Sequence, residues 1–287
     1  MLGYVKLPRL VPLFPRDVME AVQLRKENPD AEYLAGGTAL IPLLKSGAYR
    51  AGKLIDLSRL KELRYIRVGD GVIRIGPLAT HADITNNTAL RSINAFQNFA
   101  KGYTSPAVMN SATVGGSIAI ASHTEDLIPI LLALNTELTL LTPDGGKLVV
   151  ELEKYVKEHN KLKEYLILEV AFKLPASGVL CDFEKLALGI SRIPLSSVAV
   201  RVELDRGRVN GATVAVAQAY GTRPGRVREV EELLKRREIT EELIGEAANK
   251  IKQSISPPED TQASSWYRRE LAASLFTRIM RREVEHG

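Results

Sequence analysis

Two pairs of adjacent glycines constrain this chain of 287 residues more than any other feature. The first pair, Gly36-Gly37, separates a short apolar run from the segment 39–46, which has the composition of a helix. The second pair, Gly115-Gly116, precedes the apolar run 127–134. Glycines leave the main chain bare and tolerate positive φ, so consecutive N–H groups can point at one anion. Each pair alone is more typical of a tight turn, but together they predict a grip on the two phosphates of a dinucleotide.

The helix predicted after the second pair could begin at either of two residues. Ser122 and Glu125 have the spacing of a capping box, but a helix that begins at Ser122 holds Pro129 in its interior. A proline there removes a hydrogen bond and clashes with the preceding turn. With Asp126 as the N-cap, Pro129 lies in the first turn, where no N–H is missed. The sequence therefore favours a helix start at Asp126.

Five segments, in order along the chain, carry a resemblance to a known family. Two are the glycine segments, Ala35-Gly36-Gly37-Thr38-Ala39 and Thr113-Val114-Gly115-Gly116-Ser117, the second followed by Asp126 in an Asp-Leu-x-Pro run. The other three are Phe183-Glu184-Lys185, the run 195–200, and the Ser-x-x-Tyr-Arg segment 264–268. In these segments the chain resembles the FAD-binding medium subunit of the molybdenum hydroxylases, a family that includes the carbon monoxide dehydrogenase flavoprotein and the FAD domain of xanthine dehydrogenase.

The resemblance implies a cofactor site without a catalytic side chain, because a flavin carries its own redox chemistry. In that site the glycine segments would contact the FAD diphosphate through backbone N–H groups, helped by the hydroxyls of Thr38, Thr113 and Ser117. The implied cofactor-binding residues are Ala35, Gly36, Gly37, Thr38, Ala39, Tyr103, Thr113, Val114, Gly115, Gly116, Ser117, Asp126, Leu166 and Lys185.

Four of these residues have an alternative interpretation. Asp126 would accept a hydrogen bond from a cofactor hydroxyl, or would only cap its helix. Lys185 would stabilise negative charge on the reduced flavin, or would be a solvated lysine on a strand. Tyr103 and Leu166 would lie near the ring system, or would pack in the core.

The expected fold class is α+β, with a two-part FAD-binding domain followed by a C-terminal domain. Residues 1–56 are predicted to form a small α/β unit, the N-terminal FAD-binding subdomain. Residues 57–174 form the second FAD-binding subdomain, a mainly antiparallel sheet, since turn signals at 69–71 and 143–146 each separate two apolar runs. Residues 175–287 are expected to be an α+β domain with a three-stranded antiparallel sheet and a helix bundle. Tyr267, Arg268 and the later arginines are expected on a helix-packing and solvated face.

Composition limits the other functions open to the chain. The single cysteine, Cys181, cannot form a disulfide within the chain or hold an iron–sulfur cluster alone. The four histidines are scattered without ligand spacing, which predicts no metal site. Acids are interspersed with bases in a net charge of +5, which argues against a nucleic-acid surface. No apolar stretch approaches the roughly 20 residues of a membrane span, and a cytoplasmic location is expected.

The resemblance implies an electron-transfer subunit of a molybdenum-containing hydroxylase or dehydrogenase complex. A large molybdopterin subunit would oxidise the substrate, a small subunit with two [2Fe-2S] clusters would relay electrons, and this chain's FAD would pass them to an external acceptor. Such heterotrimers would pair as a dimer. The substrate and the acceptor (NAD, a quinone, a ferredoxin or oxygen) stay open.

Two other functions are weighed against this one. The chain departs from the family pattern at Met109-Asn110-Ser111 and at Gly189-Ile190-Ser191, and the change near Gly189 motivates the alternative of a non-catalytic assembly subunit that has kept the fold but lost flavin. A self-standing flavin oxidase would need a substrate-activating base, and the sequence offers none.

Overall fold

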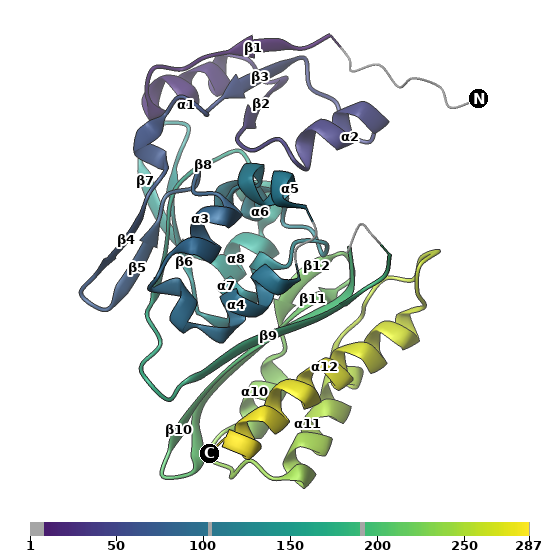
Figure 1. The fold of residues 1–287 in the computed structure, drawn as a ribbon. Coiled ribbons are helices and arrows are strands. Elements are labelled where there is room, and N and C mark those ends of the chain that lie inside the picture. Colours follow the sequence, from purple (N-terminus) through teal and green to yellow (C-terminus); the bar gives the residue numbers. More distant parts are fainter. Residues whose placement is uncertain (1–8, 103–104, 190–192, 287) are drawn as a thin grey trace.

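Three layers of secondary structure, each built on its own sheet, stack along the molecule. The computed structural model describes residues 9–102, 105–189 and 193–286. In Figure 1 the N-terminal unit lies at the top, the second sheet with its helices in the middle, and the C-terminal sheet and helices at the bottom. The mixture of helix and antiparallel sheet confirms the α+β prediction.

The N-terminal unit is a parallel sheet of three strands in the order β1-β3-β2. Its elements are β1 (Val11–Leu13), α1 (Val18–Glu27), β2 (Ala31–Leu34), α2 (Leu40–Ser46) and β3 (Lys53–Asp56). The Asp17 carboxylate accepts the N–H of Glu20 and so fixes the start of α1. Gly47 ends α2 in the left-handed conformation.

The middle unit has an antiparallel sheet of five strands in the order β4-β5-β8-β6-β7. The strands are β4 (Ile66–Gly69), β5 (Val72–Ile75), β6 (Glu137–Leu141), β7 (Lys147–Glu151) and β8 (Leu166–Lys173). Both predicted hairpins are present as β4–β5 and β6–β7. The helical segments are η1 (Lys61–Leu63), α3 (His81–Asn86), η2 (Leu90–Ser92), α4 (Asn94–Lys101), α5 (Pro106–Ser111), α6 (Val114–Ile120), α7 (Leu127–Ala133), α8 (Leu152–Lys157) and α9 (His159–Leu162).

Helix α7 is the centre of the largest hydrophobic core. Every residue of α7 is buried, which agrees with a sequence that is apolar on all sides. It begins after Asp126, with Pro129 in its first turn, and this start confirms the choice between the two capping positions. Because α7 contacts β10 and β11 as well as its own unit, one core joins the middle and C-terminal units.

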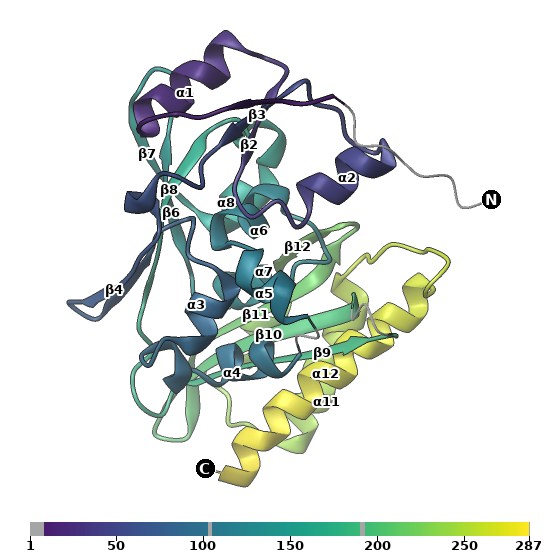
Figure 2. The ribbon, with the colours of Figure 1, turned by 45° about the horizontal axis from the view of Figure 1, so that its top comes forward.

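The C-terminal unit is an antiparallel sheet of four strands in the order β12-β11-β10-β9. Its elements are β9 (Leu180–Ala187), β10 (Pro194–Asp205), β11 (Arg208–Tyr220), β12 (Arg223–Arg226), α10 (Arg228–Leu234), α11 (Glu241–Ser254) and α12 (Ser265–His286). Alternation along β10 sends Ala199 to the core around α7 and sends Val198 and Val200 to a second core beneath the C-terminal helices. Figure 2 shows α11 and α12 side by side on the side of this sheet away from α7.

The C-terminal sheet was predicted with three strands, and the structure adds a fourth. Strand β12 has the sequence Arg-Pro-Gly-Arg, which lacks the alternation of apolar residues that predicts a strand. It pairs with the end of β11 through Ala215 and Val216. Its arginines also tie the unit to the middle one, since Arg226 bonds the Asn135 side chain and Arg223 donates to the carbonyl of Val156.

Arg268 corrects one part of the prediction of a helix-packing and solvated face at the start of α12. The residue is only 1% exposed. Its Nη1 donates to the carbonyl of Leu195 at 2.6 Å, and its Nη2 donates to both carboxylate oxygens of Asp260 at 2.8 and 2.7 Å. One buried cation therefore joins α12, the segment before it and the first residues of β10.

None of the helices within the described ranges has the length and apolar character to cross a bilayer.

Replacement of Arg268 by alanine should lower the free energy of unfolding by about 3 kcal/mol, because the carbonyl of Leu195 loses its buried partner and Asp260 its counter-ion. Urea denaturation of the full chain measures this. The control is Arg278→Ala on the same helix, where the side chain is 55% exposed and lies 3.8 Å from Glu184, so the change should stay within about 0.5 kcal/mol. Equal losses in the two variants would contradict the assigned role of Arg268.

Candidate functional site

The loop between β2 and α2 presents a row of backbone donors. Among the described residues, no protein acceptor is found for the N–H groups of Gly36, Gly37, Thr38 and Ala39. Gly37 has a φ of +67°, a conformation that L side chains rarely adopt. Consecutive N–H groups that converge around such a residue form an anion-binding concavity. We call residues 36–39 the first cradle.

Gly36 is required by close packing as well as by the cradle. A Cβ atom at this position would lie 1.9 Å from the carbonyl oxygen of Ser111, at the end of α5. Only glycine therefore lets the first cradle approach the segment that carries the second glycine pair. This contact brings together two segments about 75 positions apart in the sequence.

The second glycine pair does not form the turn that the sequence predicts. Gly115 and Gly116 lie in the first turn of α6, whose N-cap is Thr113. The N–H of Gly115 donates to the carbonyl of Pro77 at 2.9 Å, and that of Gly116 to Thr113 Oγ1 at 3.2 Å. The N–H groups of Val114 and Ser117 also have acceptors within the protein. The interpretation as a bare row of donors is thus wrong here.

The two glycines of α6 have different roles in packing. A Cβ atom on Gly115 would lie 2.5 Å from Pro77 Cβ, so this glycine permits close packing of α6 on the preceding segment. A Cβ atom on Gly116 would meet only Thr113 Oγ1 within 4 Å, and Gly116 lines a cavity. Because Gly116 has no side chain, it leaves more of that cavity's volume open.

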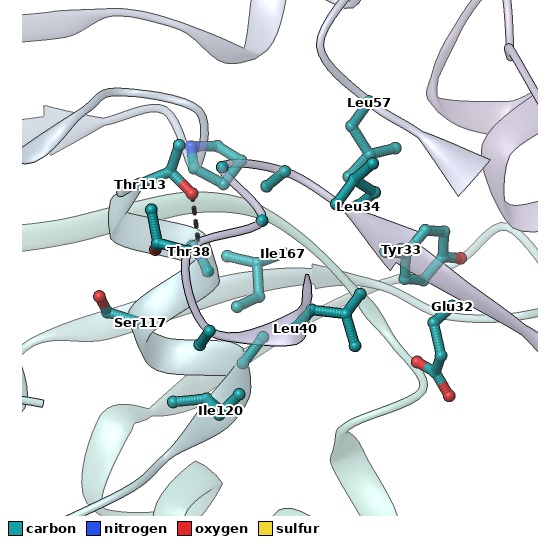
Figure 3. A pocket seen from close by; sticks show the side chains of 18 of the residues that line it. Glu32, Tyr33, Leu34, Thr38, Leu40, Leu57, Thr113, Ser117, Ile120 and Ile167 are labelled. Atoms are coloured by element: carbon teal, nitrogen blue, oxygen red, sulfur yellow. Dashed lines mark hydrogen bonds between the residues drawn. The ribbon is translucent and has the colours of Figure 1, made fainter. Parts of the chain in front are cut away.

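The first cavity has a volume of about 360 Å³ and lies between the N-terminal and middle units. Figure 3 shows Thr38, Thr113 and Ser117 at one end, and Glu32 and Tyr33 at the other. The rest of the lining is largely apolar or aromatic and includes Leu34, Tyr49, Leu57, Ile120, Tyr165, Leu166 and Ile167. An end with three hydroxyl groups and largely apolar walls match the phosphate and the flat ring of a nucleotide.

A second cavity of about 490 Å³ lies on the other side of the first cradle. Its lining includes Phe99, Asp126 and Lys185. The two cavities share Thr38, Ala39, Leu43, Ile120 and Glu125. They are therefore neighbours, with the first cradle and its donors between them.

Asp126 and Lys185 form an ion pair in the second cavity. Lys185 Nζ lies 2.5 Å from Asp126 Oδ2, and the side chains are 12% and 10% exposed. Asp126 stands at the N-cap of α7, yet its side chain accepts no helix N–H. Its other oxygen, Oδ1, is buried and has no partner among the described residues. Burial raises the pKa of Asp126, although Lys185 and the nearby Ser197 hydroxyl oppose the shift. The capping-only interpretation of Asp126 is thus wrong, and Oδ1 is left to accept a hydrogen bond.

Gly102 makes room for this lysine at the end of α4. A Cβ atom on Gly102 would lie 2.7 Å from Lys185 Cε. The alternative of a solvated lysine on a strand face is wrong, since the side chain is mostly covered.

Behind the second glycine segment lies His81, which sequence reasoning did not select. Its Nε2 is 3.0 Å from Ser117 Oγ, and the residue is 2% exposed. Burial lowers the pKa of His81 to about 4, so the imidazole is neutral at pH 7. The capping box of Thr80 and Asp83 fixes the start of α3 and could have placed His81 in its first turn.

The structure gathers most of the predicted site residues around the two cavities. The first cavity is lined by Ala35, Gly36, Gly37, Thr38, Ala39, Thr113, Gly115, Gly116, Ser117 and Leu166. Asp126 and Lys185 line the second, whereas Val114 is fully buried in the core of the middle unit. Leu166 and Lys185 therefore belong to different cavities. Tyr103 lies outside the described residues. No cluster of metal-ligating side chains occurs within the described part of the chain.

Comparisons with known proteins agree with this geometry. Residues 11–176 match the family described as FAD binding domain in molybdopterin dehydrogenase, and residues 183–282 match the CO dehydrogenase flavoprotein C-terminal domain. The glyceraldehyde dehydrogenase medium chain of Sulfolobus acidocaldarius is 28% identical over 263 residues, which cover 90% of this chain and 92% of the relative. The carbon monoxide dehydrogenase medium chain of Hydrogenophaga pseudoflava is 26% identical and covers 95% and 96%.

A solved structure extends the likeness to three dimensions. A carbon monoxide dehydrogenase from Hydrogenophaga pseudoflava that lacks the Mo-pyranopterin moiety of its molybdenum cofactor superposes with a TM-score of 0.90. The sequence identity is 25%, and the match covers 95% of this chain and 96% of that one.

The buried His81 predicts a pH-dependent stability. The pKa of the His81 imidazole is 6.5 in the unfolded chain and falls to about 4 on folding. Between these two pH values the unfolded chain therefore binds more protons than the folded chain. The stability that depends on a neutral His81 is present above pH 6.5 and is lost as the pH falls through 4. In His81→Asn, the loss of unfolding free energy between about pH 7 and pH 4.5 should be smaller by about 2 kcal/mol. Denaturation at the two pH values measures this, and parallel pH profiles for the two proteins would contradict it.

Proposed function

The chain belongs to the FAD-binding family of the molybdopterin dehydrogenases, and on that premise we propose that it is the electron-transfer flavoprotein subunit of a molybdenum-containing hydroxylase or dehydrogenase complex. The observation that carries the proposal is the first cradle, whose unpaired N–H groups stand between two cavities. A dinucleotide has this arrangement, with a diphosphate between two ring systems.

The residues of the two cavities fit the cofactor. The N–H groups of the first cradle would hold the diphosphate, with the hydroxyls of Thr113 and Ser117 nearby on α6. The unpartnered Oδ1 of Asp126 would accept a hydrogen bond from a hydroxyl of the cofactor. FAD, when bound, supplies the redox chemistry, and the protein binds and orients it.

The character of each cavity suggests which half of FAD it takes. The first cavity has apolar and aromatic walls, including Tyr165, Leu166 and Ile167, and would take the adenosine half. The second contains the Lys185–Asp126 pair and would take the isoalloxazine half, whose polar edge needs hydrogen-bonding groups. Tyr103 would belong to this half.

Partner subunits are part of the proposal. The chain has one cysteine, Cys181, which is buried and free, so iron–sulfur clusters would have to lie in another chain. We infer a small iron–sulfur subunit that delivers electrons and a large molybdopterin subunit that oxidises the substrate, in cytoplasmic heterotrimers that pair as dimers. The names of the relatives, which are medium chains of dehydrogenases, support this assignment. The intact cradle speaks against a subunit that has lost its flavin.

The proposal is tested by adding FAD to the purified full chain and to its co-expressed complex. We expect flavin absorbance that survives gel filtration, because a dinucleotide held in two neighbouring cavities dissociates slowly. In the complex, anaerobic reduction of the iron–sulfur clusters should bleach the flavin absorbance. A colourless protein after incubation with FAD would overturn the flavin assignment, and bound flavin that stays oxidised next to reduced clusters would overturn the electron-transfer role.

Gly116→Leu should weaken FAD binding by more than about tenfold, because the new side chain enters the first cavity and its Cβ, 2.9 Å from Thr113 Oγ1, displaces the N-cap hydroxyl of α6. Fluorescence titration of the full chain measures the affinity. The matched control is Gly245→Leu in α11, a glycine with no atom within 4 Å of its added Cβ and outside both cavities. Equal affinities in the two variants would show that the cofactor does not pass Gly116.

A further inference from the structure

Glu125 occupies the wall between the two cavities and has no assigned role. It lines both of them, together with Thr38 and Ala39 of the first cradle. Its backbone N–H donates to the carbonyl of Ser122, which holds the loop before α7 in a turn. Glu125 therefore belongs to the same wall as Thr38 and Ala39, whose N–H groups would hold a diphosphate.

The described charged and titratable groups around Glu125 include no cation that pairs with its carboxylate. Lys185 on β9 is engaged by Asp126 at 2.5 Å, and the Asp126 charge itself adjoins Glu125. From α6, Ser117 offers its hydroxyl, and the neutral His81 of α3 lies behind that hydroxyl at 3.0 Å.

The first-cavity side adds no counter-ion either. Glu32 on β2 bonds the Tyr49 hydroxyl at 2.7 Å and lies 3.6 Å from Arg25. His159 of α9 is bonded to the carbonyl of Ala119, and Lys163 is an exposed residue at the rim. Within the described ranges, no cation lies within ion-pair distance of Glu125.

Two physical effects oppose a charged Glu125 in the complex. Burial, reinforced by the neighbouring Asp126 carboxylate, raises the pKa of Glu125 above its ordinary value, although a hydrogen bond from the Ser117 hydroxyl opposes the shift. A diphosphate in the adjoining cradle would add two negative charges nearby, and like charges at short range disfavour ionisation further. A neutral carboxyl group, by contrast, has an O–H that can donate to an anion.

We propose that Glu125 is a further binding residue for the dinucleotide, that it acts as a neutral carboxylic acid, and that cofactor binding is accompanied by uptake of one proton at its carboxylate. This inference rests on the proposed function, because it takes the anion in the first cradle to be the diphosphate of FAD. The step is a protonation by solvent, and it involves no change in oxidation state.

The test is the pH dependence of FAD affinity, measured by fluorescence titration of the full chain. For the unaltered protein, the dissociation constant should rise by up to tenfold per pH unit above the pKa that Glu125 has without cofactor. In Glu125→Gln, the amide mimics the neutral acid, so affinity should be independent of pH and should equal the low-pH limit of the unaltered protein. Infrared difference spectra, with and without FAD, should show a protonated carboxyl band that is absent in this variant.

Glu32→Gln is the matched control, since Glu32 is the other carboxylate of the first cavity and is paired with Arg25 and Tyr49. This variant should keep the pH dependence of the unaltered protein. A flat profile in the unaltered protein, or equal slopes in it and in Glu125→Gln, would overturn the role of Glu125. Both results require that FAD binds, so they differ from failure of the proposed function, in which no variant binds FAD at any pH.

Discussion

The contact between Gly36 and the carbonyl oxygen of Ser111 is the constraint on which the site depends. It joins the N-terminal unit to the helices of the middle unit at a distance that no side chain would permit. The first cradle gains its position from this contact, because the loop 35–39 would otherwise lie farther from α6. Both cavities are bounded by the cradle, so their shapes follow from the same close approach.

The second glycine pair also contributes to the close packing of the first cradle against the middle unit, in a different way. Its donors are used inside the protein, where they fix the start of α6 against Pro77 and Thr113. Residues 36–39 therefore provide N–H groups without a protein acceptor among the described residues. Gly115 and Gly116, whose N–H groups are bonded within the protein, form part of the cavity wall and carry no side chains there. A dinucleotide site built in this way needs few charged side chains, and the Lys185–Asp126 pair is neutral as a whole.

Local signals in the sequence predict much of this architecture. The hairpins at 69–71 and 143–146 combine alternating apolar residues with turn residues, and Pro129 can be placed only in a first turn, so these elements follow from short-range rules. The burial of Arg268 depends instead on a distant partner, Leu195, and β12 pairs with the neighbouring β11 although its sequence lacks the alternation of apolar residues that predicts a strand. The helical state of Gly115 and Gly116 is likewise decided by tertiary contacts, because glycine is a poor helix former and suggests a turn. For the site, the glycine segments predict the cradle, whereas Glu125 and His81 become visible only when the cavities and their neighbours are known.

The arginines of β12 have a mechanical consequence for the second cavity. Arg226 and Arg223 fasten the C-terminal sheet to Asn135 and to Val156, while α7 fills the space between the same two units. A rotation of the C-terminal unit away from the middle unit would have to break these hydrogen bonds and expose the apolar surface of α7. The second cavity, which is lined by residues of both units, is therefore bounded by two units that these contacts hold together.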